Sequence, residues 1–107
     1  MPRFIPYRTD EGREFMIPEL KTLENESTED FLQREKDPIT RAVAFAAILL
    51  VEFNLTDAPT FTVEGLDAVF RLRRESADYS IDQCIRYFTE IEDYEMCDKL
   101  LNVKSKL

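Results

Sequence analysis

The stretch Ala42–Val51 reads AVAFAAILLV, ten consecutive apolar residues bounded by Arg41 and Glu52, and it decides the expected fold. Ten residues of α-helix rise only about 15 Å, roughly half the thickness of a bilayer's hydrocarbon core, so the stretch predicts a buried helix and not a membrane span. A helix that is apolar all round needs neighbours on every side. We therefore expect the other segments to pack around it, with Phe45 and Leu49 supplying bulk to the core.

The sequence predicts two helix starts upstream of this stretch, one a few residues before it and one about fifteen residues before it. Asp37 followed by Pro38 is typical of a helix N-cap and first helical residue, and it predicts a helix over about residues 38–54. Further upstream, Ser27 or Thr28 predicts the cap of a short helix whose first turn is acidic. Both helices would precede the part of the chain that turns back over the core.

A third helix is expected after this turn. Thr62 is a suitable N-cap, and Phe61 and Leu66 have the spacing of a hydrophobic staple, so the pattern predicts a helix from Thr62 to Arg74. The sequence Ser80-Ile81-Asp82-Gln83 matches a capping box and predicts the start of the last helical segment. Its buried stripe would contain Ile81, Cys84 or Ile85, Phe88 and Ile91.

The last segment either continues straight or breaks near Asp93. A break would make Asp93 a new N-cap for a helix over residues 94–103, with Leu100 and Leu101 buried. Residues 94–100, YEMCDKL, are similar to the helical-hairpin segment of the UVR motif, a protein–protein contact module of nucleotide-excision-repair subunits. Leu101 stands where that motif usually has arginine. The resemblance covers this short segment alone and implies a helix break near Asp93.

The first 18 residues differ from the rest of the chain. Their prolines rule out a regular helix, and residues 9–12 (TDEG) are typical of a turn. One interpretation is a β-hairpin that pairs residues 3–7 with 13–17 and leaves Pro6 at an edge. The alternative is an extended arm laid over the helices or over a partner.

These expectations combine into a mainly α fold. We expect one folding unit: a small bundle of four to five helices around a buried central helix at about 38–54, with residues 19–107 forming the helical domain and residues 1–18 an N-terminal hairpin or arm. On this view, deleting residues 1–18 would leave a folded helical protein and abolish partner binding.

The overall charge restricts the partners. The chain has 22 acidic and 14 basic residues, a formal net charge of −8, which repels phosphate backbones and anionic membranes. Arg71, Arg73 and Arg74 form the one basic cluster and are expected to pair within the chain. We therefore expect no direct nucleic-acid binding and no membrane binding, and favour a partner protein with a basic or apolar groove.

Residue types also exclude most catalytic sites. The chain has no histidine and only two glycines, which excludes histidine-dependent triads, histidine metal motifs and glycine-rich phosphate loops. Cys84 and Cys97 would lie about 20 Å apart in one helix, too far for a disulfide. We expect reduced thiols, no catalytic residues, no metal and no cofactor. Because the N-terminus MPRFIPYRTD has no apolar signal segment, we also expect a cytoplasmic protein.

Two groups of residues are candidates for partner binding. The first is the aromatic and apolar set near the N-terminus, because tyrosine, phenylalanine and methionine are enriched at interface cores. The second is an acidic cluster, which could face a basic partner or a divalent cation, or could be a solvated turn; its spacing does not fit an EF-hand loop. The candidate residues are Phe4, Tyr7, Phe15, Met16, Glu90, Glu92, Asp93, Tyr94, Glu95 and Asp98.

Three functions remain open from the sequence. The favoured one is a non-enzymatic accessory, adaptor or inhibitor protein, of the kind common among phage- and plasmid-encoded regulators, that binds another protein. A second is an acidic nucleic-acid mimic that blocks the nucleic-acid site of its partner. A third is a self-assembling structural or assembly subunit, and the sequence leaves open a homo-oligomer.

Overall fold

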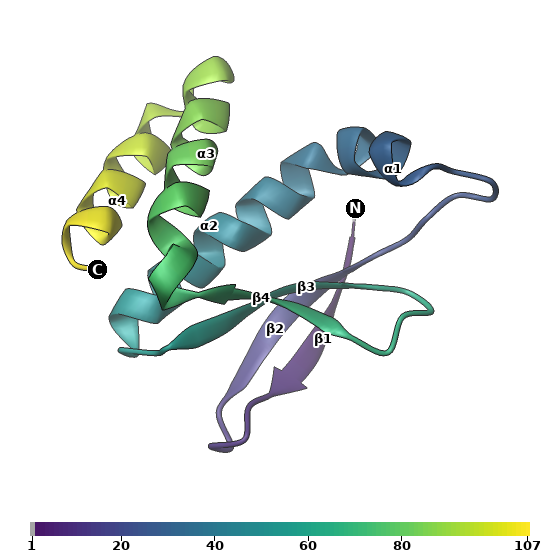
Figure 1. The fold of residues 1–107 in the computed structure, drawn as a ribbon, viewed down its shortest axis with the longest axis horizontal. Helices are drawn as coiled ribbons and strands as arrows, with labels where there is room; N and C mark the ends of the chain where they lie inside the picture. The colour runs from purple at the N-terminus through teal and green to yellow at the C-terminus, as the bar shows by residue number, and fades with distance from the viewer. Residues whose placement is uncertain (1) are drawn as a thin grey trace.

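Four β-strands form a single sheet, and α-helices pack against it and against each other (Figure 1). The computed structural model describes residues 2–107. Its 50% helix and 24% strand make it an α/β fold, so the predicted all-α helical bundle is wrong. The elements are β1 (Arg3–Arg8), β2 (Glu14–Leu20), α1 (Thr28–Arg34), α2 (Lys36–Glu52), β3 (Asp57–Val63), β4 (Val69–Arg73), the 3-10 turn η1 (Arg74–Ser76), α3 (Ala77–Glu90) and α4 (Tyr94–Ser105).

The sheet is mixed, with the strand order β1-β2-β3-β4. β1 and β2 form an antiparallel hairpin, and β3 and β4 form a second one with an irregularity between Pro59 and Phe61. The two hairpins join through parallel pairing of β2 with β3, in which Glu19 is opposite Thr62. Parallel neighbours need a crossover connection, and α1 and α2 supply it here. α2 runs across the sheet. α3 and α4 lie side by side and pack against α2 (Figure 1).

Of the two interpretations for the N-terminus, the structure has the β-hairpin. β1 pairs with β2 from Arg3 opposite Glu19 to Arg8 opposite Glu14. Gly12, with a φ of +83°, closes the turn by donating its backbone N–H to the Thr9 carbonyl at 2.9 Å. A positive φ costs glycine little, which explains its place in this turn. β2 runs on to Leu20, past the expected boundary at residue 18.

The apolar stretch does form the central helix, α2, but one side of it is open. Its buried side packs on the sheet and α3 through Ala42, Ala44, Ala46, Ala47, Leu49 and Leu50. Phe45 is exposed, so its expected place in the core is wrong. α2 also begins earlier than predicted, at Lys36 with Glu35 as N-cap. Asp37 is therefore not the N-cap but lies inside the first turn, and its side chain accepts hydrogen bonds from Arg41 and Tyr87.

The expected helix from Thr62 to Arg74 is wrong, because this segment forms the β3–β4 hairpin. β-branched and aromatic residues suit an extended chain. The Thr62 hydroxyl donates to the Ala68 carbonyl at 2.6 Å across the hairpin instead of capping a helix. Leu66 lies exposed in the connecting turn, and Gly65 there has a φ of +89°.

The predicted helix break at Asp93 is confirmed. The Asp93 carboxylate accepts a hydrogen bond from the backbone N–H of Met96 at 3.3 Å and caps α4. Two other expectations are wrong. α3 begins at Ala77, so Ser80 lies inside the helix and does not cap it. Ile91 and Leu101, which were expected to be buried, are exposed. The buried stripe of α3 is Ile81, Cys84 and Phe88, and α4 contributes Leu100.

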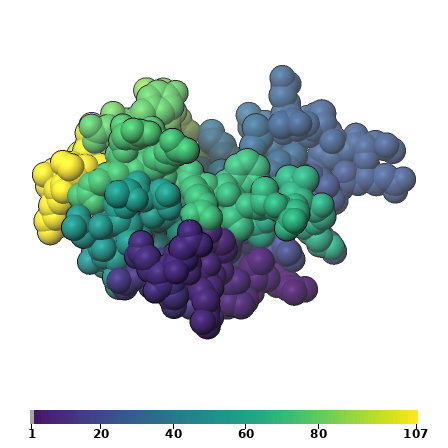
Figure 2. Space-filling model, turned by 60° about the horizontal axis from the view of Figure 1, so that its bottom comes forward, coloured from purple at the N-terminus to yellow at the C-terminus, as the bar shows by residue number. Residues whose placement is uncertain are grey.

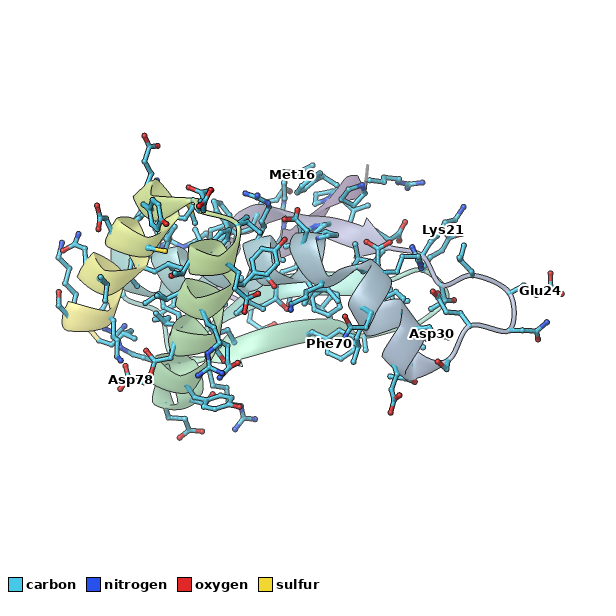
Figure 3. The ribbon with its side chains drawn as sticks, turned by 90° about the horizontal axis from the view of Figure 1, so that it is seen from above. Met16, Lys21, Glu24, Asp30, Phe70 and Asp78 are labelled. Carbon is cyan, nitrogen blue, oxygen red and sulfur yellow. The ribbon has the colours of Figure 1, made fainter. Side chains whose placement is uncertain are left out.

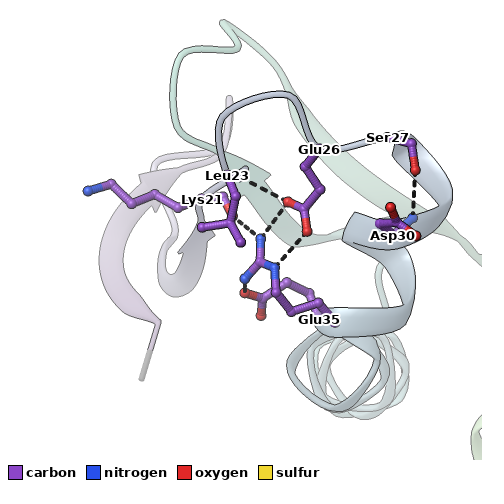
Figure 4. A network of polar contacts seen from close by, with 7 residues as sticks. Lys21, Leu23, Glu26, Ser27, Asp30 and Glu35 are labelled. Atoms are coloured by element: carbon purple, nitrogen blue, oxygen red, sulfur yellow. Dashed lines mark hydrogen bonds and ion pairs between the residues drawn. The ribbon is translucent and has the colours of Figure 1, made fainter.

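The loop between β2 and α1, whose Lys21, Leu23 and Glu26 are labelled in Figure 4, is secured by Arg34. Its Nε and Nη2 each donate to the Glu26 carboxylate at 2.8 Å, and Nη2 also reaches the Lys21 carbonyl. The Arg34 hydrogen bonds, helped by one from the Leu23 backbone N–H, lower the pKa of Glu26 to about 2. The predicted cap of α1 is confirmed at Ser27, whose hydroxyl accepts the Asp30 N–H at 3.1 Å.

Candidate functional site

An apolar groove of about 410 Å³ lies between the β1–β2 hairpin and the N-terminal half of α2. The strands supply one wall and the helix supplies the other. Its polar surface is small, with Arg41 as its one charged side chain. The lining residues are Pro2, Phe4, Met16, Pro18, Pro38, Arg41, Ala42, Phe45 and Thr60.

Three large apolar side chains of this groove are open to solvent. Phe4 is 56% exposed, Met16 52% and Phe45 52%. They come from β1, β2 and α2, and the pairing of Phe4 with Pro18 brings the two strands to the same wall. Single exposed apolar residues are normal, but a contiguous group around a concave surface is typical of an interaction site. We call this set, Phe4, Met16 and Phe45, the apolar triad.

Arg41 lies at the edge of the groove and connects it to α3. Its guanidinium stacks over the Phe88 ring at 5.4 Å and donates to Asp37 at 2.9 Å. The other Asp37 oxygen accepts the Tyr87 hydroxyl at 2.6 Å. Burial raises the pKa of Asp37, but the hydrogen bonds from Tyr87 and Arg41 outweigh it and hold that pKa below its ordinary value. The same Asp37 contact raises the pKa of Tyr87.

The predicted aromatic set is divided by the structure. Phe4 and Met16 both line the groove, and Figure 3 labels Met16 on the β1–β2 side of the sheet. Tyr7 instead contacts Arg71 of β4, through its hydroxyl and its ring. Phe15 is buried and packs edge-on against Phe53, with the ring centroids 5.7 Å apart.

The predicted acidic residues lie at the α3–α4 turn, at the end of α3 remote from the sheet (Figure 1). Glu90, Glu92, Glu95 and Asp98 are exposed, as is Tyr94, whereas Asp93 is half-buried as the α4 cap. The Asp37 hydrogen bond is the main cause that raises the pKa of Arg41, and the charge of Asp93 contributes. Arg41 therefore lines the groove and also interacts with the negative charge of Asp93 in the α3–α4 turn.

Phe45 and Arg41 are the site residues that sequence reasoning missed. A signal was available: Arg41, Phe45 and Glu52 recur at positions i, i+4 and i+11, which fall on one helical face. The two charged residues that bound the apolar stretch therefore mark the solvent side of α2, and Phe45 lies between them.

A second apolar hollow lies beside α1, lined in part by Phe31, Leu32, Phe61, Leu66 and Phe70. Phe61 and Phe70 stack with their ring centroids 4.7 Å apart, so each ring covers part of the other ring's apolar surface. Phe70 lies on the β4 side of the sheet, away from Met16 (Figure 3). We take the groove between the hairpin and α2 as the candidate site because it gathers two residues predicted from the sequence.

Other kinds of site are limited in the described part of the chain. Among residues 2–107, no three cysteine, aspartate or glutamate side chains are placed to hold a metal ion. Cys84 and Cys97 are free and buried, and burial raises the pKa of the Cys84 thiol to about 11. No helix in this range has both the length and the apolar character needed to cross a bilayer.

Comparison with known proteins returns no family model, curated protein or solved structure that matches this chain. The site is therefore characterised by its own geometry.

Proposed function

We propose that this protein is a non-enzymatic binding protein, an adaptor or inhibitor, that holds another protein in the groove between the β1–β2 hairpin and α2. The observation that carries this proposal is the solvent-exposed apolar triad, Phe4, Met16 and Phe45, gathered around one concave surface. Burying one large apolar side chain contributes about 1.5–3 kcal/mol, so covering the triad yields a gain large enough to offset part of the cost of association.

The charge of the molecule supports a partner that carries positive charge. The net charge is −8, and Arg41, which lines the groove, is close enough to Asp93 of the α3–α4 turn for the charge of Asp93 to help raise its pKa. A partner that fills the groove with apolar side chains and presents basic residues around them would match both features. Because both thiols are free, we place this function in a reducing, cytoplasmic compartment.

The proposal is tested by affinity capture from a lysate of the native host, with the variant Phe45→Ser compared with the wild type. Leu101→Ser is the matched control, because Leu101 is also an exposed apolar residue on a helix but lies on α4, outside the groove lining. We expect Phe45→Ser to lose the captured protein and Leu101→Ser to retain it. Circular dichroism establishes that both variants are folded.

Equal capture by the two variants would contradict the proposal. The salt dependence of capture separates it from the nucleic-acid mimic, since an apolar contact weakens little between low and high salt whereas a charge-mimicking contact weakens strongly. Light scattering separates it from self-assembly, because a dimer that Phe45→Ser dissociates would place a second copy in the groove.

A further inference from the structure

A second concave surface of the molecule also exposes large apolar side chains. The apolar hollow beside α1, of about 390 Å³, lies between that helix and the β3–β4 hairpin. Leu32 of α1, Leu66 of the hairpin turn and Phe70 of β4 line it, and they are 47%, 55% and 47% exposed. Phe70 stays this exposed although its ring stacks on Phe61. Apolar side chains left open around a concave surface are typical of an interaction site.

This hollow is separate from the groove between the β1–β2 hairpin and α2. The two cavities share no lining residue. Figure 3 labels Asp30 and Phe70 on one side of the molecule and Met16, which lines the groove, on the other. An occupant of one cavity therefore leaves the lining of the other open.

The two segments that line the hollow are acidic. Its lining residues come from residues 22–32 and 61–70. These segments contain no lysine or arginine and six acidic residues, which are Glu24, Glu26, Glu29, Asp30, Glu64 and Asp67. The local charge is therefore negative before the side chains of neighbouring segments are counted.

Neighbouring cations pair with two of these six carboxylates and leave four. Arg34 pairs with Glu26 at 2.8 Å, and Lys21 pairs with Glu64 at 3.6 Å. The remaining four are exposed and have no ion-pair partner among residues 2–107; they are Glu24, Glu29, Asp30 and Asp67. The unbalanced charge of these segments is therefore that of four carboxylates.

Unpaired carboxylates flank the hollow on both of its walls. Glu29 follows the lining residue Thr28 on α1, and Asp67 follows the lining residue Leu66 in the hairpin turn. An apolar hollow with negative charge around it is complementary to a segment that has an apolar centre and basic flanks. The same charge attracts such a segment before contact is made.

We propose that the hollow beside α1 binds a segment of a second partner protein in which apolar residues are flanked by lysine or arginine. The apolar side chains pack on Leu32, Leu66 and Phe70, and the basic side chains face Glu29 and Asp67. This inference goes beyond the proposed function and does not rest on it, because the hollow and the groove share no residue. With both cavities occupied, the protein acts as an adaptor that joins two proteins and not as an inhibitor of one.

The test selects a displayed library of random peptides on the wild-type protein, with counter-selection against Leu32→Ser/Leu66→Ser. We expect peptides in which lysine or arginine flanks apolar residues. The peptide that binds best should bind this variant about tenfold more weakly, because two large apolar side chains no longer pack on it. Ile91→Ser/Leu101→Ser is the matched control, because both residues are exposed and line neither cavity, and it should bind as the wild type does. Circular dichroism establishes that both variants are folded.

The variant Glu29→Gln/Asp67→Asn tests the charge. We expect it to bind the same peptide about fivefold more weakly, the size expected for the loss of two exposed ion pairs. Glu95→Gln/Asp98→Asn is the matched control, because it makes the same change in net charge at exposed positions of α4, at the other end of the molecule from α1 (Figure 1). It should bind as the wild type does at about 0.15 M salt, where charges more than about 8 Å apart are largely screened.

The outcomes keep this inference apart from the proposed function. A selection that yields no peptide dependent on Leu32 and Leu66 would overturn the inference and leave the proposed function standing, since that function is tested by Phe45→Ser. Binders without basic residues, or equal weakening by the two charge variants, would overturn the basic partner. Loss of peptide binding in Phe45→Ser would overturn the separation of the two cavities. A dimer that Leu32→Ser/Leu66→Ser dissociates, detected by light scattering, would make a second copy the occupant and overturn the inference.

Discussion

Arg74 shows how one residue can join two distant parts of this fold. Its Nη1 donates to the carbonyl oxygens of Leu50 and Leu55, each at 3.1 Å. Leu50 is in the last turn of α2, where carbonyl groups have no partner within the helix. A cation there also interacts favourably with the negative end of the helix dipole. The expected pairing of this arginine within the chain is therefore made with backbone and not with an acidic side chain.

The Asp37 contacts predict a pH-dependent stability. The folded-state pKa of Asp37 is below its ordinary value, so its contribution is present above about pH 4 and is lost as the pH falls through the folded-state pKa. Tyr87→Phe removes one of the hydrogen bonds that hold the carboxylate ionised. We expect the variant to be about 1 kcal/mol less stable at pH 6, with the difference shrinking towards pH 2.5.

Urea unfolding at the two pH values measures this effect. Tyr94→Phe is the control, because Tyr94 is exposed and its change should leave stability unaltered at both. A Tyr87→Phe difference of the same size at pH 6 and pH 2.5 would show that Asp37 protonation is not coupled to this contact.

At the scale of the element, α2 has two sides with different roles. Its small residues allow the sheet and α3 to approach closely, while Phe45 faces the groove. Small side chains on the buried side leave no space for a larger or charged group. The helix therefore tolerates substitution on one side only.

Substitution of a fully buried alanine tests this division. Ala46 is 0% exposed, so Ala46→Asp buries a carboxylate without a partner and should cost about 3–5 kcal/mol, a large part of the stability of a small domain, and lower the melting temperature strongly. Phe45→Asp, one position away, should remain folded because the site is open to water. The melting transition followed by circular dichroism distinguishes them; similar melting temperatures would contradict the assignment of the two sides.

The sequence predicted helix ends better than strands, for a physical reason. The caps at Ser27 and Asp93 form hydrogen bonds with residues only three positions away, so their signal is local. The pairing of Glu19 with Thr62 joins residues far apart in the chain, and no local pattern reveals it. The staple spacing of Phe61 and Leu66 was misleading because the same residues fit a strand and a turn.

In the candidate site, too, the sequence predicted what depends on local residues and missed what depends on long-range packing. Phe4 and Met16 were predicted from composition alone, as apolar residues in a segment that could not be a helix. That they line one groove together with Phe45 depends on how the hairpin lies against α2, which is a tertiary arrangement.

At the scale of the whole molecule, the sheet has two edges, β1 and β4, and both carry features that oppose pairing with other chains. β1 contains Pro6, which lacks a backbone donor, between Arg3 and Arg8 (β1 is purple in Figure 2). β4 presents Arg71 and Arg73. Proline and charge on edge strands are common protections against aggregation. An occupant of the groove therefore gains more from side-chain packing than from adding a strand.

The position of β2 inside the sheet predicts the effect of truncation. Phe15 and Ile17 of this strand are buried and would be removed by deletion of residues 1–18, whereas Glu19 and Leu20, which pair with β3, would remain without their strand. Deleting residues 1–18 should therefore abolish the cooperative unfolding transition, contrary to the expectation from the sequence of a stable helical remainder. Deleting residues 1–8 alone removes an edge strand and should lower the unfolding midpoint while keeping a single transition.

Urea titration monitored by circular dichroism compares the two truncations with the full chain. A cooperative transition with an unchanged midpoint after deletion of residues 1–18 would show that the first hairpin is dispensable for folding.

The parallel pairing of β2 with β3 also has a consequence for synthesis of the protein. A ribosome completes the first hairpin long before it has made Asp57–Val63, the neighbour that covers the free side of β2. Until then, a partly apolar strand edge is open to other nascent chains, and long-range contacts of this type form slowly. The period of greatest risk for misassembly therefore ends when β3 has been made and can pair with β2.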